Sequence, residues 1–339
     1  MRLPAMHPLE RKLATELSPL QGGSLLLAVS GGPDSVALLR GVLNLRPLEH
    51  GPLAVAHFNH GLRVDAAVDQ DFVHALCTSL GVVCEVGQAD RNLCQQTAGV
   101  GLEAAARQAR YRFLSAQAEN LRITHVLTAH TADDQAETVL HRILRGTGLR
   151  GLKGIERARP LNERCQLVRP LLDVSRREVV DYLASIGQTA RQDPTNAQTK
   201  QTRNRIRNEL IPLLKRDFNP DVDQALLRLG RLAGEVGAIT NELVAQGLRD
   251  YVESTEDFVA IQATGMARLS PYLIRQVLAR VWQLRHWPER EMDHAQWLTL
   301  ERMIVEGRPT ARSLPGGVRA KRQGEQLTLT RPVDRSIRA

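Results

Sequence analysis

The chain has 339 residues, of which 42% are hydrophobic and 24% charged, and this composition excludes collagenous, low-complexity and wholly disordered proteins. Its 45 Lys and Arg residues outnumber 37 Asp and Glu, so the net charge is +8 and an acidic partner such as nucleic acid or a phosphorylated substrate is expected. No stretch reaches the roughly 18 to 20 apolar residues of a membrane helix, and the N-terminal residues lack the apolar core of a signal peptide, so we expect a cytoplasmic protein.

The first half of the chain alternates apolar runs with helical patterns. Strands are predicted at residues 25–29, 53–56, 82–86 and 125–128, with helices at 34–45, 67–80 and 101–119. This alternation is typical of a parallel sheet covered by helices on both faces. Because such sheets bind ligands at the carboxyl ends of their strands, the chemistry is expected there.

The second half is predicted to be mostly helical. Helices are expected at residues 175–186, 205–214, 222–251, 271–286 and 294–306, and small β-hairpins at 311–331. Turn signals at 217–220 divide the chain into an α/β catalytic domain, residues 1–216, and a smaller helical domain, residues 217–339. Residues 138–215 hold 16 Lys or Arg against 7 Asp or Glu, which indicates a folded basic surface; a solvated face without a specific partner is the alternative.

A glycine-rich loop joins the first strand to the first helix of the sheet. It consists of Ser30, Gly31, Gly32, Pro33, Asp34 and Ser35. Glycines allow a tight turn, serines add hydroxyl donors, and the helix N-terminus presents N–H groups and the positive end of its dipole. The loop lacks the lysine of a Walker A loop and the spacing of a dinucleotide fingerprint. It predicts a phosphate site, although a simple turn capped by Asp34 is the alternative.

A second group of polar residues follows the strand at 125–128. A helix that begins near residue 132 places Asp133 and Glu137 one turn apart, close to Asp134 and His130. Its buried stripe is expected to consist of Ala136, Val139, Leu140, Ile143 and Leu144, with Gly146 ending the helix. Such carboxylates bind Mg²⁺ with ATP phosphates, or bind an ammonium group and accept its proton. Taken alone, Asp133 is better explained as an acidic residue that complements the helix dipole, but His130, the two aspartates and Glu137 together at one strand end favour a functional cluster.

The basic residues leave two interpretations open. Arg107 and Arg110 either pair with Glu103 along one helix or border the active site and grip a phosphate. Arg203, Arg205 and Arg207 alternate, so they cannot all share one helical face: some pair while others meet solvent or ligand. Residues 146–154, which include Arg150 and Lys153, are rich in glycine and suggest a mobile loop. His57 and His60 either line a nucleotide pocket or cap the sheet.

These motifs together resemble a known family. The loop at residues 30–35 is similar to the signature of the N-type ATP pyrophosphatases, or PP-loop enzymes. With the segments at 57–63, 103–111, 128–138, 145–152, 169–172, 193–196 and 203–207, the chain resembles the tRNA(Ile)-lysidine synthetases. The resemblance implies a parallel-sheet PP-loop domain of the adenine-nucleotide α-hydrolase type, followed by the helical domain, which would bind tRNA.

The resemblance also implies an activity and its site residues. Members ligate free L-lysine to the wobble cytidine of tRNA(Ile) with a CAU anticodon: the cytosine carbonyl oxygen attacks the α-phosphate of ATP, and the lysine amine then displaces AMP. The implied catalytic residues are Asp34, Asp133, Asp134, Glu137, His130 and Arg107, with Mg²⁺ on Asp34 and Asp134. Implied ATP ligands are residues 30–35, His57 and Arg205. Implied tRNA contacts are Arg110, Arg145, Arg150, Lys153, Arg203 and Arg207.

Rival functions remain at this stage. Another PP-loop enzyme is disfavoured because Cys77, Cys84, Cys94 and Cys165 form no paired motif for sulfur transfer, and because the 145–152 and 193–196 segments differ from those expected for amidation. A metal-dependent phosphohydrolase would leave the glycine-rich loop unexplained, and a non-catalytic RNA-binding protein would not turn over ATP. Longer relatives add a C-terminal domain, which leaves acceptor-end recognition unassigned for this chain. The oligomeric state is open, a homodimer being one option.

Overall fold

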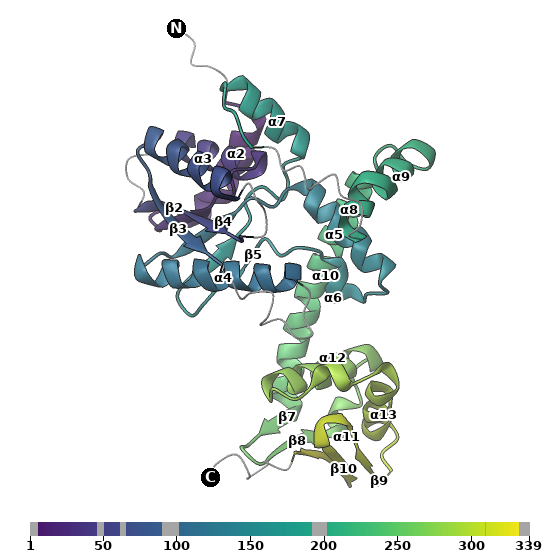
Figure 1. Cartoon of the computed structure of the whole chain (residues 1–339). Helices are drawn as coiled ribbons and strands as arrows, with labels where there is room; N and C mark the ends of the chain where they lie inside the picture. The colour runs from purple at the N-terminus through teal and green to yellow at the C-terminus, as the bar shows by residue number, and fades with distance from the viewer. Residues whose placement is uncertain are drawn as a thin grey trace. The chain divides into compact units, whose positions relative to one another are not determined.

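The computed structural model describes residues 6–45, 51–61, 66–89, 102–191, 202–308 and 310–331 (Figure 1). The chain divides into two compact units, Met1–Ala233 and Gly234–Ala339. The turn predicted at 217–220 separates α9 (Ile211–Asp217) from α10 (Val222–Tyr251). The first turns of α10 nevertheless pack in the first unit, because Leu226 lies in one apolar cluster with Val139 and Ile206. The domain limits 1–216 and 217–339 stay a prediction.

A six-stranded sheet forms the centre of the first unit, in the order β3-β2-β1-β4-β6-β5. Its strands are β1 (Leu25–Ala28), β2 (Leu53–Asn59), β3 (Val83–Gln88), β4 (His125–Thr128), β5 (Ala158–Pro160) and β6 (Gln166–Val168). The pairs β1–β2, β1–β4, β2–β3 and β4–β6 are parallel, whereas β5 is antiparallel to β6. The predicted parallel α/β fold is confirmed; the three-residue strands β5 and β6 were missed.

Successive residues of β1 face opposite sides of the sheet, and both sides are covered. Leu25 and Leu27 are buried in the cluster that includes α1, α2, α3 and α7 side chains, while Leu26 is buried on the other side with Leu114 and Ala118 of α4. Figure 1 shows α2, α3 and α7 on one side of the strands and α4 on the other. Burial on both sides explains why β1 reads as a continuous apolar run.

The helices of the first unit agree with prediction in most places. They are α1 (Pro8–Leu17), α2 (Pro33–Leu45), α3 (Ala66–Ser79), α4 (Leu102–Asn120), α5 (Ala132–Leu144), α6 (Leu149–Leu152), α7 (Arg176–Ser185) and α8 (Thr202–Arg205), continued by the π-helix η3 (Ile206–Leu210) and α9, with a 3-10 turn at η1 (Ser18–Leu20). The expected apolar stripe of α5 was wrong at its end: Ile143 and Leu144 are 40% and 59% exposed. Gly146 follows the helix with φ +71°, a conformation that glycine adopts without strain.

The second unit combines helices with an antiparallel sheet. The strands β7 (Val252–Ser254), β8 (Phe258–Gln262), β9 (Thr310–Ser313), β10 (Arg319–Gln323) and β11 (Gln326–Thr330) form a sheet in the order β7-β8-β11-β10-β9. The helices α11 (Ala263–Met266), α12 (Pro271–Leu284) and α13 (His294–Val305) accompany it, with 3-10 turns at η4 (Glu289–Glu291) and η5 (Pro315–Gly317). The predicted hairpin region is confirmed as β9 to β11, while the β7–β8 hairpin was missed. Trp282 is fully buried in this unit, between Trp287 and Trp297.

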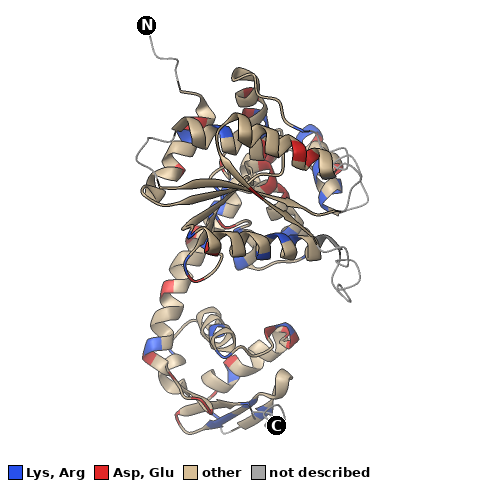
Figure 2. Cartoon of the chain, turned by 60° about the vertical axis from the view of Figure 1, so that its left-hand side comes forward, with Lys and Arg blue, Asp and Glu red and all other residues tan. Residues whose placement is uncertain are grey.

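Charged residues are interspersed over both units, and Figure 2 shows Lys and Arg on each. Among the described residues, no helix is long and apolar enough to cross a membrane.

Candidate active site

The glycine-rich loop follows β1 at the carboxyl edge of the parallel sheet. Gly31 has φ +91°, which favours glycine, and the turn is closed by the Ser35 hydroxyl. Ser35 Oγ donates to the Gly32 carbonyl at 2.9 Å and accepts from the Ser30 N–H at 3.2 Å. Pro33 begins α2, whose first N–H groups have no partners within the helix. The loop therefore presents N–H donors and the positive end of a helix dipole, as an anion site requires.

Asp34 lies in the first turn of α2 with one carboxylate oxygen free. Its Oδ2 is 3.7 Å from Arg176 Nη2, whereas Oδ1 is buried and has no hydrogen-bond partner among the described residues. The pKa of Asp34 is raised to about 6. Burial is the main cause and the nearby Asp134 and Asp133 add to it, whereas Arg176 acts in the opposite direction. An orphaned carboxylate oxygen of this kind is suited to receiving a cation.

The N-terminus of α5 fixes two of the predicted carboxylates. Thr131 is the N-cap, and its N–H donates to Asp134 Oδ2 at 3.0 Å. Burial raises the pKa of Asp134, but the Thr131 N–H together with Arg203 and His130 outweighs burial and holds it below its usual value. Asp133 instead accepts the N–H of Arg176 through Oδ2 at 2.7 Å, so it also anchors the start of α7.

Glu137 is only 2% exposed and is paired with two arginines. Arg207 forms a fork with it, Nε to Oε1 at 2.5 Å and Nη2 to Oε2 at 2.9 Å, and Arg203 Nε lies 3.2 Å from Oε2. The same two arginines reach Asp134 Oδ1, at 3.3 Å for Arg203 and 3.1 Å for Arg207. The alternation of the arginines is thereby resolved: Arg203 and Arg207 pair with carboxylates, whereas Arg205 pairs with Glu209 in solvent.

A π-helical turn carries Arg207 into this position. In η3 the Ile211 N–H donates to the Ile206 carbonyl, five residues before it. Pro212, which follows, has no N–H to donate and would clash with a carbonyl four residues earlier in an α-helix. The π turn accommodates this proline, and such turns are frequent at functional sites.

His130 lies between β4 and α5 beside both acidic and basic groups. Its Nδ1 is 3.2 Å from the Thr128 hydroxyl. Burial lowers the pKa of His130 to about 3; Asp134 raises it, and Arg169, Arg110 and Arg107 lower it. The imidazole is therefore neutral near pH 7, suited to hydrogen bonding and not to donating a proton as a general acid.

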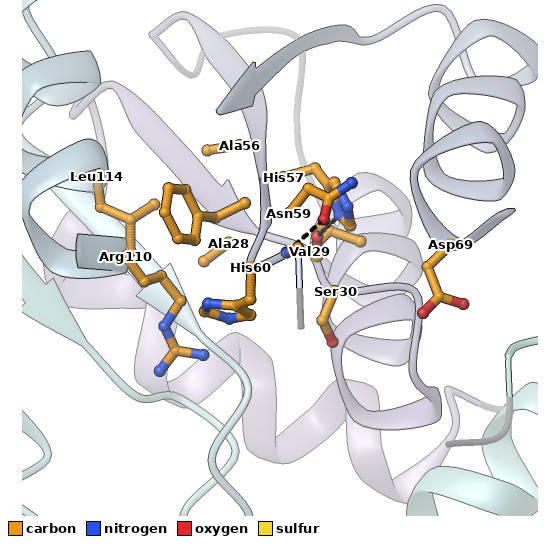
Figure 3. Close-up of a pocket in the computed structure, with 12 residues that line it drawn as sticks. Ala28, Val29, Ser30, Ala56, His57, Asn59, His60, Asp69, Arg110 and Leu114 are labelled. Atoms are coloured by element: carbon orange, nitrogen blue, oxygen red, sulfur yellow. Dashed lines mark hydrogen bonds between the residues drawn. The ribbon is translucent and has the colours of Figure 1, made fainter. Parts of the chain in front are cut away.

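A pocket of about 180 Å³ opens beside the loop, at the carboxyl ends of β1 and β2 (Figure 3). Its lining includes Ser30, His57, Asn59, His60 and Arg110. His57 is buried, and its Nδ1 lies 2.9 Å from the Val29 carbonyl, which can only accept, so this nitrogen carries the proton. Burial lowers the pKa of His57. His57 therefore bonds to the sheet edge and also lines the pocket, while the binding of a nucleotide there stays a prediction.

Arg107 and Arg110 are adjacent to the active-site edge through Tyr111. Their guanidinium carbons lie 5.1 and 5.4 Å from the Tyr111 ring centroid. Arg110 also lines the pocket, as Figure 3 shows. Glu103 has no described side chain, so its predicted salt bridge with Arg107 is not tested. The position of Arg110 in the pocket lining favours the interpretation that this helix borders the active site.

Residues 146–154 are held against α5. Arg142 Nη1 donates to the Gly151 and Gly154 carbonyls at 2.6 and 2.7 Å, and Gln135 Nε2 donates to the Lys153 carbonyl at 2.9 Å. Arg145 and Arg150 are exposed, and Lys153 is ion-paired with Glu156. The structure therefore gives these residues a short helix and fixed anchors, while their predicted contact with tRNA and their predicted mobility stay predictions. The motif at 193–196, Lys200, Arg63 and Cys94 lie outside the described residues.

Sequence reasoning missed two kinds of residue at this edge. Arg176 contacts both Asp34 and, through its N–H, Asp133. Arg159 and Arg169 lie near Tyr111: the Arg159 guanidinium carbon is 5.0 Å from the ring centroid, and Arg169 helps to lower the pKa of the tyrosine. Arg169 belongs to the 169–172 segment of the family resemblance, but no role was predicted for it; its position directly after the apolar residues of β6 is the signal that would have indicated a site residue.

The residues present fit a magnesium ion on Asp34 better than on Asp134. The free Oδ1 of Asp34 lies at the phosphate loop, whereas both oxygens of Asp134 already accept hydrogen bonds from Thr131, Arg203 and Arg207. Within the described part of the chain, no group of three or more His, Cys, Asp or Glu residues is arranged to hold a metal ion by itself. Mg²⁺ arriving with ATP needs fewer protein ligands than a resident ion, because phosphate oxygens and water complete its shell.

Comparison with known proteins identifies the family. The PP-loop domain model matches residues 5–214. The tRNA(Ile)-lysidine synthase of Nostoc sp. is 33% identical over 325 residues, covering 92% of each chain. The synthases of Dehalococcoides mccartyi and Geobacillus kaustophilus are 38% and 34% identical, over 77% and 76% of this chain. This chain spans 56% and 55% of those two proteins, about half the length of such longer relatives.

A solved structure shows the same fold at low identity. The U34-tRNA thiolase NcsA from Methanococcus maripaludis, determined with its 4Fe-4S cluster, aligns with a TM-score of 0.57 and 15% identity, over 67% of this chain and 78% of that one. The fold, the family match and the full-length relative agree with the geometry at the sheet edge. The chain belongs to the PP-loop family and, within it, to the tRNA(Ile)-lysidine synthases.

Proposed function

We propose that the protein acts in the cytoplasm as a ligase that joins free L-lysine to the wobble cytidine of tRNA(Ile) with a CAU anticodon, converting ATP to AMP and pyrophosphate. The modification would change the decoding and charging of this tRNA from methionine to isoleucine. The observation that carries the proposal is the phosphate loop with its free Asp34 oxygen, set at one sheet edge with Asp133 and Asp134, in a chain aligned over 92% of its length with a synthase of that name.

The first step forms an adenylated cytidine. The carbonyl oxygen of the cytosine attacks the α-phosphorus of ATP, and the bond to the β-phosphate oxygen breaks. The N–H groups of the first turn of α2 and the Ser30 hydroxyl would bind the departing pyrophosphate, while the Ser35 hydroxyl, already bonded to the Gly32 carbonyl, would hold the loop in shape. Mg²⁺ held by Asp34 would neutralise charge on the phosphate oxygens. Adenylation converts a poor leaving oxygen into a good one.

The second step joins the lysine amine to the carbon that bears this oxygen. The carbon–oxygen bond breaks, AMP leaves with the former carbonyl oxygen, and the amine loses its proton. Asp133 is the carboxylate that we assign to the amine, because it accepts the Arg176 N–H through Oδ2 but, unlike Asp134 and Glu137, is not paired with Arg203 or Arg207. Glu137 would first have to release Arg207 and Arg203. We therefore assign lysine to Asp133 and retain Glu137 as the residue that orders the two arginines.

The paired carboxylates also weigh against a metal-dependent phosphohydrolase. Such an enzyme would use His130, Asp133 and Asp134 as ligands, but Asp134 Oδ1 already accepts from two arginines. A phosphohydrolase would in addition not explain the glycine-rich loop at residues 30–35.

The test uses the full chain with ATP, Mg²⁺, labelled lysine and a tRNA(Ile) transcript. We expect label to enter a transcript with a CAU anticodon and not one with UAU. Asp34→Asn should abolish tRNA-dependent release of pyrophosphate, whereas Asp181→Asn, a surface change on α7, should leave it intact. If lysine never enters the RNA, or enters both transcripts equally, the proposed function is wrong.

A further inference from the structure

Four arginines from three elements surround one tyrosine in the first unit. Arg107 and Arg110 of α4 and Arg159 of β5 place their guanidinium carbons 5.0 to 5.4 Å from the Tyr111 ring centroid. Arg107 Nη2 donates to the Tyr111 hydroxyl at 3.2 Å, and Arg169, which follows β6, is close enough to help lower the pKa of the same tyrosine. The aromatic ring holds the cations close together without neutralising them, because cation–π contacts add no negative charge.

Two of these arginines have buried donors with nothing to bind. Arg169 is only 3% exposed; its Nη1 donates to the Glu156 carbonyl at 2.5 Å, but its Nε has no partner among the described residues. Arg110 Nε is likewise buried and without a partner there. Leaving a buried donor without an acceptor costs free energy, and more when the group is charged, so an arrangement of this kind indicates an absent acceptor.

Charge compensation within this cluster is incomplete. Glu156 is a carboxylate near these arginines. Its hydrogen bond to Lys153 makes the largest contribution to lowering its pKa, and Arg169 and Arg159 make smaller ones. Burial lowers the pKa of Arg169, as does the charge of Arg159. Burial raises the pKa of Tyr111, yet Arg107 and Arg110 outweigh burial and lower it. Among the described residues, no ion pair joins Arg107, Arg110, Arg159 or Arg169 to a carboxylate, and the exposed Glu156 is already paired with Lys153.

We propose that Arg107, Arg110, Arg159 and Arg169 form a phosphoryl-anion site that grips a backbone phosphate of the RNA beside the target nucleoside. The site rests on the proposed function for its RNA. Guanidinium forks match phosphate oxygens in geometry and charge. In the proposed function, the phosphates of ATP bind at the loop of residues 30–35 and the N-terminus of α2. The arginines on α4, on β5 and directly after β6 can therefore bind a phosphate of another molecule, the RNA. Arg110 also lines the pocket beside the loop, together with Ser30 and His60. A phosphate held here would bring its nucleoside to the edge where the carboxylates stand.

The test measures binding, so that it does not depend on ligation. We compare Arg169→Gln and Arg159→Gln with Arg164→Gln, an exposed arginine between β5 and β6, as the matched control. Affinity for a tRNA(Ile) transcript is measured against salt concentration, and affinity for ATP with Mg²⁺ is measured separately. Because Arg169 is buried, a thermal melt accompanies each variant, and the half-buried Arg159 keeps the test valid should Arg169→Gln fail to fold.

We expect both site variants to weaken RNA binding about tenfold and to reduce the slope of log affinity against log salt by about one, with ATP binding unchanged. Arg164→Gln should bind RNA as the unmodified chain does. Loss of ATP affinity with unchanged RNA affinity would assign the phosphate to ATP and overturn the proposal. Unchanged binding of both ligands in folded Arg159→Gln would overturn it as well. Lysine incorporation plays no part in these readouts, so their failure is distinct from failure of the proposed function.

Discussion

The buried charge of Asp34 should lower the free energy of unfolding of the ligand-free protein near neutral pH, and replacing this residue should restore that free energy. In the folded chain the pKa of this carboxyl is about 6, against 3.8 for an ordinary aspartate. The folded state therefore binds more protons than the unfolded state between about pH 4 and pH 6, so stability falls as pH rises through that window. A difference of this size corresponds to up to about 3 kcal/mol, at 1.36 kcal/mol for each pH unit.

Asp34→Asn removes the buried charge while keeping the shape of the side chain. We expect the variant to match the unmodified chain at pH 4 and to exceed it by up to about 3 kcal/mol at pH 7.5, measured by urea unfolding without ATP or Mg²⁺. The difference between the two proteins cancels the other carboxylates, which titrate in both. Asp181→Asn, at a side chain 61% exposed, is the control and should change neither value by more than about 0.5 kcal/mol.

A stability difference that is the same at both pH values would refute the argument, and so would a variant less stable at pH 7.5. The result bears on function because the same variant should fail to release pyrophosphate. A residue that costs stability when charged, yet is needed in its charged form for catalysis, is expected at a cation site. Mg²⁺ with ATP should accordingly stabilise the unmodified chain more than Asp34→Asn.

Three further predictions follow from the pairing of charges. Glu137→Gln should destabilise the chain by about 3 to 5 kcal/mol in urea unfolding, because it leaves Arg207 partly buried without its fork; a change under 1 kcal/mol would contradict this assignment. The ring resonances of His130, whose pKa is about 3, should not shift in NMR spectra between pH 5 and pH 8, and a midpoint in that range would show an exposed imidazole. Arg205→Ala should alter stability by at most about 0.5 kcal/mol, since its partner Glu209 is also exposed; a rise in the Kd for ATP would then establish its predicted ligand role.

Local patterns predicted the parts of the fold that depend on local physics. The run at β1 is apolar throughout because both faces are covered, and α2 begins where Pro33 follows two glycines. The short strands β5 and β6 were missed because three residues carry too little alternation to register. The β7–β8 hairpin was missed for a similar reason, since its turn, residues 255–257, contains no glycine or proline.

The partners of the site residues could not be predicted from the sequence, because they lie far away along the chain. The sequence placed Asp133, Asp134 and Glu137 on one helix turn, but their partners lie 43 to 73 residues further along the chain. No local pattern reports which arginine will reach which carboxylate. Arg203 and Arg207 had therefore been assigned to tRNA, and a contact with tRNA would now have to compete with Asp134 and Glu137.

The pairing of Arg203 and Arg207 with carboxylates also affects where lysine and Mg²⁺ would bind in the proposed reaction. Arg203 and Arg207 follow residues 192–201 in the chain, and they neutralise two of the four carboxylates at the sheet edge, Asp134 and Glu137. Lysine arrives as a cation, and its ammonium group would be repelled by arginines left unpaired. With both arginines held by Asp134 and Glu137, the remaining attraction at this edge comes from Asp133 and Asp34. If Mg²⁺ binds Asp34 as proposed, we expect the lysine amine to bind Asp133, which the Arg176 N–H holds in position.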